Sequence, residues 1–88
     1  MSITVKVSRS GTADRIVAKI NSSSLKFDSD GNAQRDLEAG KHNFSWRIEG
    51  SAKQTFNVRI VSPQRAATGA KGTLKDEGVI IGTHDFFL

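Results

Sequence analysis

The amino-acid sequence predicts an all-β fold, a single antiparallel β-sandwich of about seven or eight short strands. Apolar and polar residues alternate with a period of two along most of the chain, as strands with one buried face require. Turn-forming residues recur about every 8 to 12 positions, which is the spacing of short strands joined by tight connections. Helical spacing is almost absent, so an architecture of parallel strands linked by helices is excluded.

The length of the chain sets one domain, spanning residues 1–88. Domains typically contain roughly 50 to 250 residues, so a second core cannot be built. Leu, Ile, Val and Phe occupy 22 of the 88 positions, which is above the level expected of a disordered chain and suffices for a small core. The sequence contains no Cys, which excludes disulfide bonds and thiolate metal sites.

The first half of the chain contains four expected strands with apolar residues two positions apart. They lie at residues 3–7, 16–20, 25–27 and 33–37. Between the third and the fourth, Asp30-Gly31 offers the positive φ angles of a tight hairpin turn. The fourth strand is the most polar and has the weakest pattern.

The clearest alternation lies between Leu37 and Val61. Its apolar face consists of Phe44, Trp46, Ile48, Phe56, Val58 and Ile60. A turn at Gly50-Ser51 divides these residues into two runs, which predicts a β-hairpin with Trp46 at the centre of the core. The opposite face of this hairpin is expected to expose Arg47 and Arg59 together.

The last third of the chain begins at Pro63, which ends the preceding strand because proline has no amide donor. Residues 63–72 contain mainly Ala, Gly, Gln, Thr and basic residues, and we expect them to form a flexible loop. Residues 73–88 are expected to form a C-terminal strand segment.

Residues 27–61 resemble a known group of modules. The resemblance rests on Asp28-Ser29-Asp30-Gly31-Asn32-Ala33, then Leu37-Glu38-Ala39-Gly40-Lys41-His42, then the alternating Phe44, Trp46 and Ile48. This order is similar to that of bacterial immunoglobulin-like and prealbumin-like sandwich modules, including carboxypeptidase regulatory-like and PEGA-type domains. The resemblance implies an immunoglobulin-like sandwich in which Leu37 fills the core, Gly40 permits the corner and His42 is partly buried. It also implies a spacer, stalk or binding accessory rather than an enzyme.

The charge of the chain is unevenly distributed. The formal net charge is +4, and five basic residues between Lys53 and Lys75 occur without an acid. A positive field of this kind attracts nucleic acid or anionic glycans, although scattered basic residues also keep small β-proteins soluble. Polyanion binding is therefore an alternative function. Its expected residues are Arg47, Arg59, Arg65, Lys71 and Lys75.

Catalytic and metal-binding patterns are weak. Asp28, Asp30 and Asn32 match the first three ligand positions of a calcium loop, but Ala33 and Ala39 replace its required Gly and Glu. The chain has two His residues, fewer than the three or four ligands of a tight zinc site, and no nucleophile elbow. We therefore predict no catalytic residues, no metal site, no cofactor and no enzymatic activity.

The C-terminal segment supplies the main functional prediction, a structural or protein-interaction module that assembles through strand edges and an apolar tail. Adjacent Phe86 and Phe87 would face opposite sides of a strand, so one of them needs a partner or a second layer. The predicted assembly residues are Val79, Ile81, Phe86, Phe87 and Leu88. We expect a protein partner or self-association, with the segment either pairing with another subunit or forming the last strand of its own sandwich. Carbohydrate binding through Phe86 or Phe87 is a second alternative.

The sequence assigns no cellular compartment. No apolar run reaches 18 residues, and the first residues contain no charged leader followed by an apolar stretch. We therefore expect neither a membrane span nor an export signal in this chain.

Overall fold

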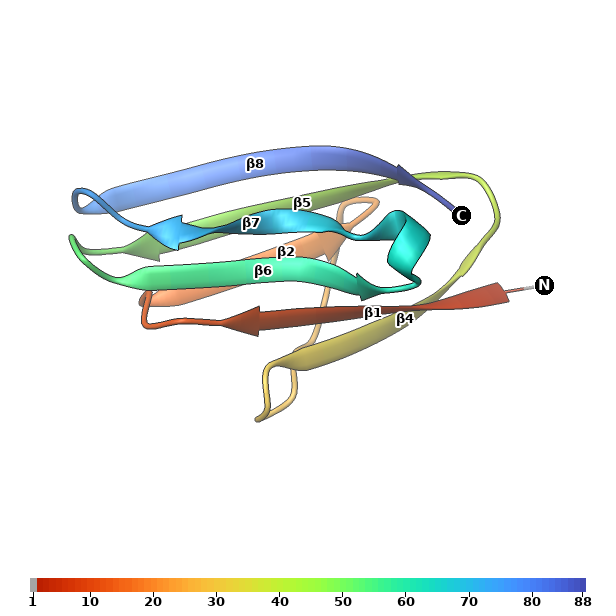
Figure 1. Ribbon diagram of the computed structural model, residues 1–88, viewed down its shortest axis with the longest axis horizontal. Helices are drawn as coiled ribbons and strands as arrows, with labels where there is room; N and C mark the ends of the chain where they lie inside the picture. The colour runs from red at the N-terminus through yellow and green to blue at the C-terminus, as the bar shows by residue number, and fades with distance from the viewer. Residues whose placement is uncertain (1) are drawn as a thin grey trace.

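The computed structural model describes residues 2–88, which form two four-stranded antiparallel sheets packed face to face (Figure 1). One sheet has the order β4-β1-β6-β7 and the other the order β3-β2-β5-β8. The elements are β1 (Ser2–Ser10), β2 (Arg15–Ile20), β3 (Ser23–Ser24), β4 (Asn32–Glu38), β5 (Lys41–Gly50), β6 (Thr55–Ser62), the 3-10 helix η1 (Gln64–Ala66), β7 (Thr68–Thr73) and β8 (Gly78–Phe87). The predicted all-β sandwich is confirmed.

The core lies between the two sheets and consists of the inward-facing residues of each strand. Its fully buried members are Val5, Val7, Ile20, Phe44, Ile48, Val58 and Ile60, together with Ala18. Each such large apolar side chain stabilises the fold by about 1.5–3 kcal/mol when it leaves water. The period-two pattern placed all of these residues on the correct face of their strands, because successive side chains of a strand point to opposite sides.

The predicted hairpin between the two strongest strands is wrong. β5 pairs with β2 and β8, whereas β6 pairs with β1 and β7, so the turn after Gly50 carries the chain from one sheet to the other. Two strands that face each other across a core alternate in the same way as two strands paired side by side. Arg47 on β5 and Arg59 on β6 consequently point to opposite outer surfaces of the sandwich.

Trp46 is not at the centre of the core. It is partly buried and packs against the core, whereas its neighbours Phe44 and Ile48 are fully buried. Trp46 is paired with Gly82 on the edge strand β8, and its indole lies where a side chain at Gly82 would be. The large ring therefore covers the rim of the sandwich rather than its middle.

The third expected strand and its hairpin turn are also wrong. Residues 25–27 form no strand, and the only strand in this region is the short β3. β3 belongs to one sheet and β4 to the other, so the intervening segment crosses between the sheets and cannot pair with β4. Leu25, in this segment between β3 and β4, is buried. Gly31 does adopt a positive φ of 81°, and Asp28 Oδ1 accepts the backbone N–H groups of Asp30 (2.9 Å) and Asn32 (3.0 Å).

The corner between β4 and β5 agrees with expectation. Leu37 packs against the core, and Gly40 takes a φ of 131° where the chain moves from one sheet to the other. A residue with a Cβ rarely adopts this conformation, so glycine suits the position. Ser62 ends β6 directly before Pro63, also as expected.

The stretch 63–72 is not an irregular loop. Gln64–Ala66 forms the 3-10 helix η1, which buries Ala66, and β7 then pairs with β6 from Thr68 to Thr73. An edge strand of small residues forms because the ladder to β6 bonds its backbone, which requires no apolar side chains. Of the strand segment expected at residues 73–88, Thr73 ends β7, and Gly78–Phe87 forms the continuous strand β8.

Arg35 joins the two sheets at the side where β4 and β3 lie. Its guanidinium is partly buried and donates hydrogen bonds to the carbonyl oxygens of Ser23 (3.0 Å) and Ser24 (2.8 Å), and a longer one to Ile20 (3.4 Å). An inward-pointing charge on an edge strand also disfavours further strand pairing there.

Candidate functional site

The free edge of β8 is the first candidate site. β8 lies at the end of its sheet, and its ten residues pair with β5 without a bulge or register shift. Next to this ladder, Leu88 and Gly40 exchange two backbone hydrogen bonds of 2.9 Å, which makes them a hydrogen-bonded pair. Such pairs alternate with non-hydrogen-bonded pairs along an antiparallel ladder. The odd-numbered residues of β8, from Val79 to Phe87, therefore direct their N–H and C=O groups away from β5.

The odd-numbered residues of β8 also carry exposed apolar side chains. Ile81 is 71% exposed, Phe87 63% and Val79 47%, and all three lie on the outer face of the sheet. Isolated exposed apolar residues are common, but a run along one strand edge is not. Backbone groups without strand partners and apolar side chains thus occur together on one edge.

Two polar residues separate Ile81 from Phe87 on this row. Asn43 on β5 donates one amide hydrogen to Thr83 Oγ1 (2.7 Å) and another to Asp85 Oδ1 (3.1 Å). Lys41 Nζ lies 3.4 Å from Asp85 Oδ2. The hydrogen bond from Asn43 and the nearby charge of Lys41 lower the pKa of Asp85 below its ordinary value, so this carboxyl is ionised at neutral pH.

The five predicted assembly residues divide into two groups. Val79, Ile81 and Phe87 are exposed on the outer face of β8. Phe86 is only 3% exposed and belongs to the core, where its ring lies 5.6 Å from that of His42, and Leu88 is partly buried. The prediction of a contact surface at Phe86 is wrong, because the register with β5 directs its side chain inward. Within residues 2–88 the segment forms the last strand of its own sandwich.

The other edges differ from β8 in composition. β4 carries charged residues on both faces, with Arg35 directed inward and Asp36 outward. β7 carries Lys71 and two glycines, and β3 is only two residues long. Charged side chains and short length are usual means by which proteins prevent edge pairing. From Val79 to His84, β8 contains no Lys, Arg, Asp, Glu or Pro.

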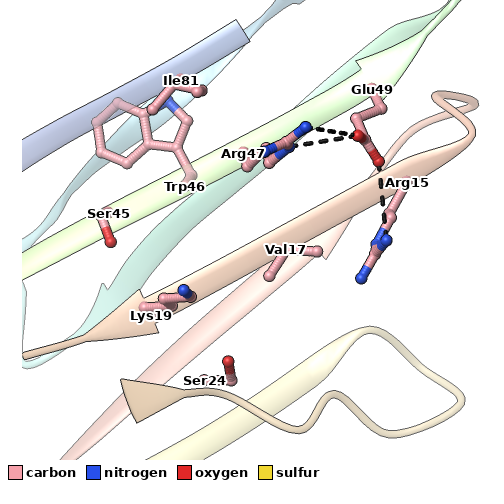
Figure 2. Close-up of a pocket in the computed structure, with 9 residues that line it drawn as sticks. All are labelled: Arg15, Val17, Lys19, Ser24, Ser45, Trp46, Arg47, Glu49 and Ile81. Carbon is pink, nitrogen blue, oxygen red and sulfur yellow. Dashed lines mark hydrogen bonds and ion pairs between the residues drawn. The ribbon is translucent and has the colours of Figure 1, made fainter. Parts of the chain in front are cut away.

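A shallow groove of about 590 Å³ lies on the outer face of β2 and β5, beside Ile81 (Figure 2). Figure 2 shows Arg47 and Arg15 both reaching Glu49, with Arg47 Nη2 at 3.0 Å and Arg15 Nη1 at 3.9 Å from its carboxylate oxygens. Lys19 lies on the same face. The exposed ion pair contributes at most about 1 kcal/mol, but it occupies the guanidinium of Arg47.

The predicted polyanion-binding residues do not form one surface. Arg59 and Lys71 lie close together on the outer face of the β4-β1-β6-β7 sheet, since Gly69 is paired with Arg59 and Asn57 with Lys71. Arg47 is on the opposite sheet and is paired with Glu49. Arg65 is in η1, and Lys75 follows β7 in the turn before β8. Sequence reasoning missed Lys6, which is exposed on the same outer face as Arg59.

His42 and Asp28 both make hydrogen bonds within the fold. The ring nitrogens of His42 lie 2.9 Å from Asn21 Nδ2 and 2.7 Å from the Glu38 carbonyl oxygen. Since the amide nitrogen can only donate, Nδ1 accepts and Nε2 donates, which fixes one tautomer of the partly buried ring. Asp28 is engaged with the backbone of its own turn. Across residues 2–88, no cluster of three or more His, Asp or Glu side chains is placed to hold a metal ion.

No family model, curated protein or solved structure matches this chain. The part of the chain that the structure describes contains no helix long and apolar enough to cross a membrane.

Proposed function

We propose that this protein is a non-catalytic protein-interaction module that accepts an additional β-strand on the free edge of β8. The observation that carries the proposal is that the odd-numbered residues of β8 combine two features. These residues direct their backbone groups away from β5 and also expose the side chains of Val79, Ile81 and Phe87. An added strand gains affinity from main-chain hydrogen bonds and specificity from alternate side chains.

The contrast between the edges supports the choice of β8. The edge strands β4 and β7 carry charged side chains that weaken strand addition, and β3 is too short to guide a partner. β8 offers ten residues in regular register, and the six residues after Gly78 include no Lys, Arg, Asp or Glu. A long, regular and apolar edge favours pairing with another strand.

A peptide with the sequence of residues 78–88 tests whether the edge accepts a strand. Titrated into isotopically labelled protein, it is expected to shift the backbone amides of the odd-numbered β8 residues most, because these gain hydrogen bonds. A peptide with proline at position 83 is the matched control, since it lacks one of the required donors. Equal shifts with both peptides, or shifts centred on β7 or β4, would contradict the proposal.

One observation favours polyanion binding as a second candidate function. Lys6, Arg59 and Lys71 share the outer face of the β4-β1-β6-β7 sheet, and within residues 2–88 none of them forms an ion pair with an acid. Such a face would bind heparin more weakly as salt is added, because bound counterions are released on binding. We expect Arg59→Glu with Lys71→Glu to elute earlier from heparin. Arg47→Glu is the control and leaves elution largely unchanged if only this face binds.

A further inference from the structure

We infer that the strand accepted by β8 is β8 of a second copy of this chain, paired antiparallel about a two-fold axis at His84. The inference rests on the proposed function, because it names the partner of the same edge. It predicts a symmetric dimer in which the two β3-β2-β5-β8 sheets continue into one another. Most soluble homo-oligomers are closed two-fold dimers of this kind.

The backbone of β8 is compatible with this axis. In a two-fold antiparallel pairing about His84, residue 83 lies opposite residue 85 of the second copy, and residue 81 opposite residue 87. All four are odd-numbered, so they direct N–H and C=O groups to the free edge. Each of these pairs can exchange two backbone hydrogen bonds. The two copies of His84 then meet as a non-hydrogen-bonded pair.

The side chains of the outer row are self-complementary about the same axis. Ile81 lies opposite Phe87 of the second copy, which joins the two most exposed apolar side chains in a favourable aromatic and β-branched pair. Thr83 lies opposite Asp85 of the second copy. Because Thr83 Oγ1 already accepts a hydrogen bond from Asn43, its hydroxyl hydrogen is available to donate to that carboxylate.

Neighbouring positions of the axis give poorer pairs. An axis at Thr83 places Ile81 opposite Asp85, which buries a carboxylate against an apolar side chain. An axis at Gly82 places Asp85 opposite Val79, with the same result. An axis at Asp85 opposes the two Asp85 carboxylates, and an axis at Ile81 opposes Asp85 and Glu77. Like charges directly opposite one another are destabilising, so His84 is the favoured centre.

A cysteine at the axis tests the register. The chain contains no Cys, so His84→Cys supplies the only thiol. Non-hydrogen-bonded pairs bring Cα atoms to about 4.5 Å, which lies within the range of disulfide bonds. We expect mild oxidation to convert His84→Cys into a covalent dimer of native fold. Lys71→Cys, on the edge strand β7 of the other sheet, is the matched control and should form no disulfide-linked dimer under the same oxidation.

A charge on the edge tests the surface without disturbing the fold. Ile81 is 71% exposed, so the Ile81→Lys variant should fold normally while placing a charge on the free edge of β8. We expect its self-association to weaken by at least about tenfold, as measured by sedimentation equilibrium. Val61→Lys replaces an exposed apolar residue on the other sheet and should associate like the unmodified chain.

The salt dependence of dimer formation provides an independent test. Two copies that each carry a net charge of +4 repel one another, so added salt should strengthen the dimer until the repulsion is screened. The outcomes decide the inference as follows. A concentration-dependent dimer that cross-links through His84→Cys and is weakened by Ile81→Lys supports it. A dimer that Ile81→Lys leaves intact, or one in which His84→Cys does not cross-link, overturns it. A chain that stays monomeric to millimolar concentration also overturns it. If the 78–88 peptide still binds such a monomer, the strand-accepting function survives; if it does not, both fail.

Discussion

Gly82 lies directly opposite Trp46 in the β5–β8 ladder, and a Cβ at Gly82 would lie 2.5 Å from two carbon atoms of the indole. Real Cβ contacts are never so short, so the indole depends on the absence of a side chain at Gly82. Trp46 in turn covers the backbone of β8 at this point. The contact between Trp46 and Gly82 therefore helps to pack β8, the proposed interaction edge, against β5.

Gly82→Ala should destabilise the protein because the added methyl group displaces a rigid ring. Overpacking of this kind costs about 1–3 kcal/mol, which urea unfolding followed by tryptophan fluorescence will measure. Trp46→Phe provides room, so Gly82→Ala should cost clearly less in that background, with unfolding then followed by circular dichroism. Equal costs in both backgrounds would show that the two residues are not coupled.

Arg35→Met should destabilise the protein by about 1–3 kcal/mol. The methionine keeps much of the apolar stem but loses the hydrogen bonds to Ser23, Ser24 and Ile20, so their carbonyl groups lose a charged donor. Gln34→Ala is the control, because Gln34 is exposed on the same strand and should change stability by less than about 0.5 kcal/mol. The free energies of unfolding from urea titrations decide between them.

Gly69→Ala should loosen β7 from β6. A Cβ at Gly69 would overlap the carbonyl oxygen of Val58 and the Cβ of Arg59, and these atoms are part of the β6 strand itself. We expect a loss of about 1–3 kcal/mol and faster amide exchange in β7 than in β8. Gly72→Ala is the milder comparison, since its nearest contact is the ring of Phe56 at 3.2 Å. Unchanged exchange in β7 would contradict this prediction.

Asp85 should titrate below its ordinary pKa of 3.8 in the folded protein. The hydrogen bond from Asn43 and the charge of Lys41 favour the ionised form, so the stabilisation is complete above the unfolded-state pKa. It is lost as the pH falls through the lower, folded-state pKa. NMR titration of the carboxyl carbon will measure this value. Asn43→Ala should raise it, and an identical midpoint in the variant would show that Asn43 is not the main cause.

Alternation alone predicted much of the fold, because the two faces of a strand differ in their access to water. It identified the inward positions of β1, β2, β5 and β6, and Pro63 and Gly40 marked an end and a corner. The same alternation made Ile81 and Phe87 candidates for an exposed surface. These features depend on the side-chain chemistry and backbone freedom of single residues, and both follow directly from the residue type at each position.

Alternation could not identify strand partners. Phe44 and Val58 have the same pattern whether their strands are neighbours in one sheet or face each other across the core. The predicted hairpin was therefore wrong, and so was the expectation that Arg47 and Arg59 share one exposed face. β7 was missed because its backbone bonds to β6, and small side chains give no signal for that.

The sequence by itself determined a small all-β core and an apolar C-terminal segment. Only the tertiary structure decided that Phe86 enters the core while Phe87 stays exposed, and that β8 forms an edge whose odd-numbered residues direct their backbone groups outward. The register with β5 sets both outcomes. A register is a relationship between residues distant in the chain, held by backbone hydrogen bonds that every residue type except proline can form.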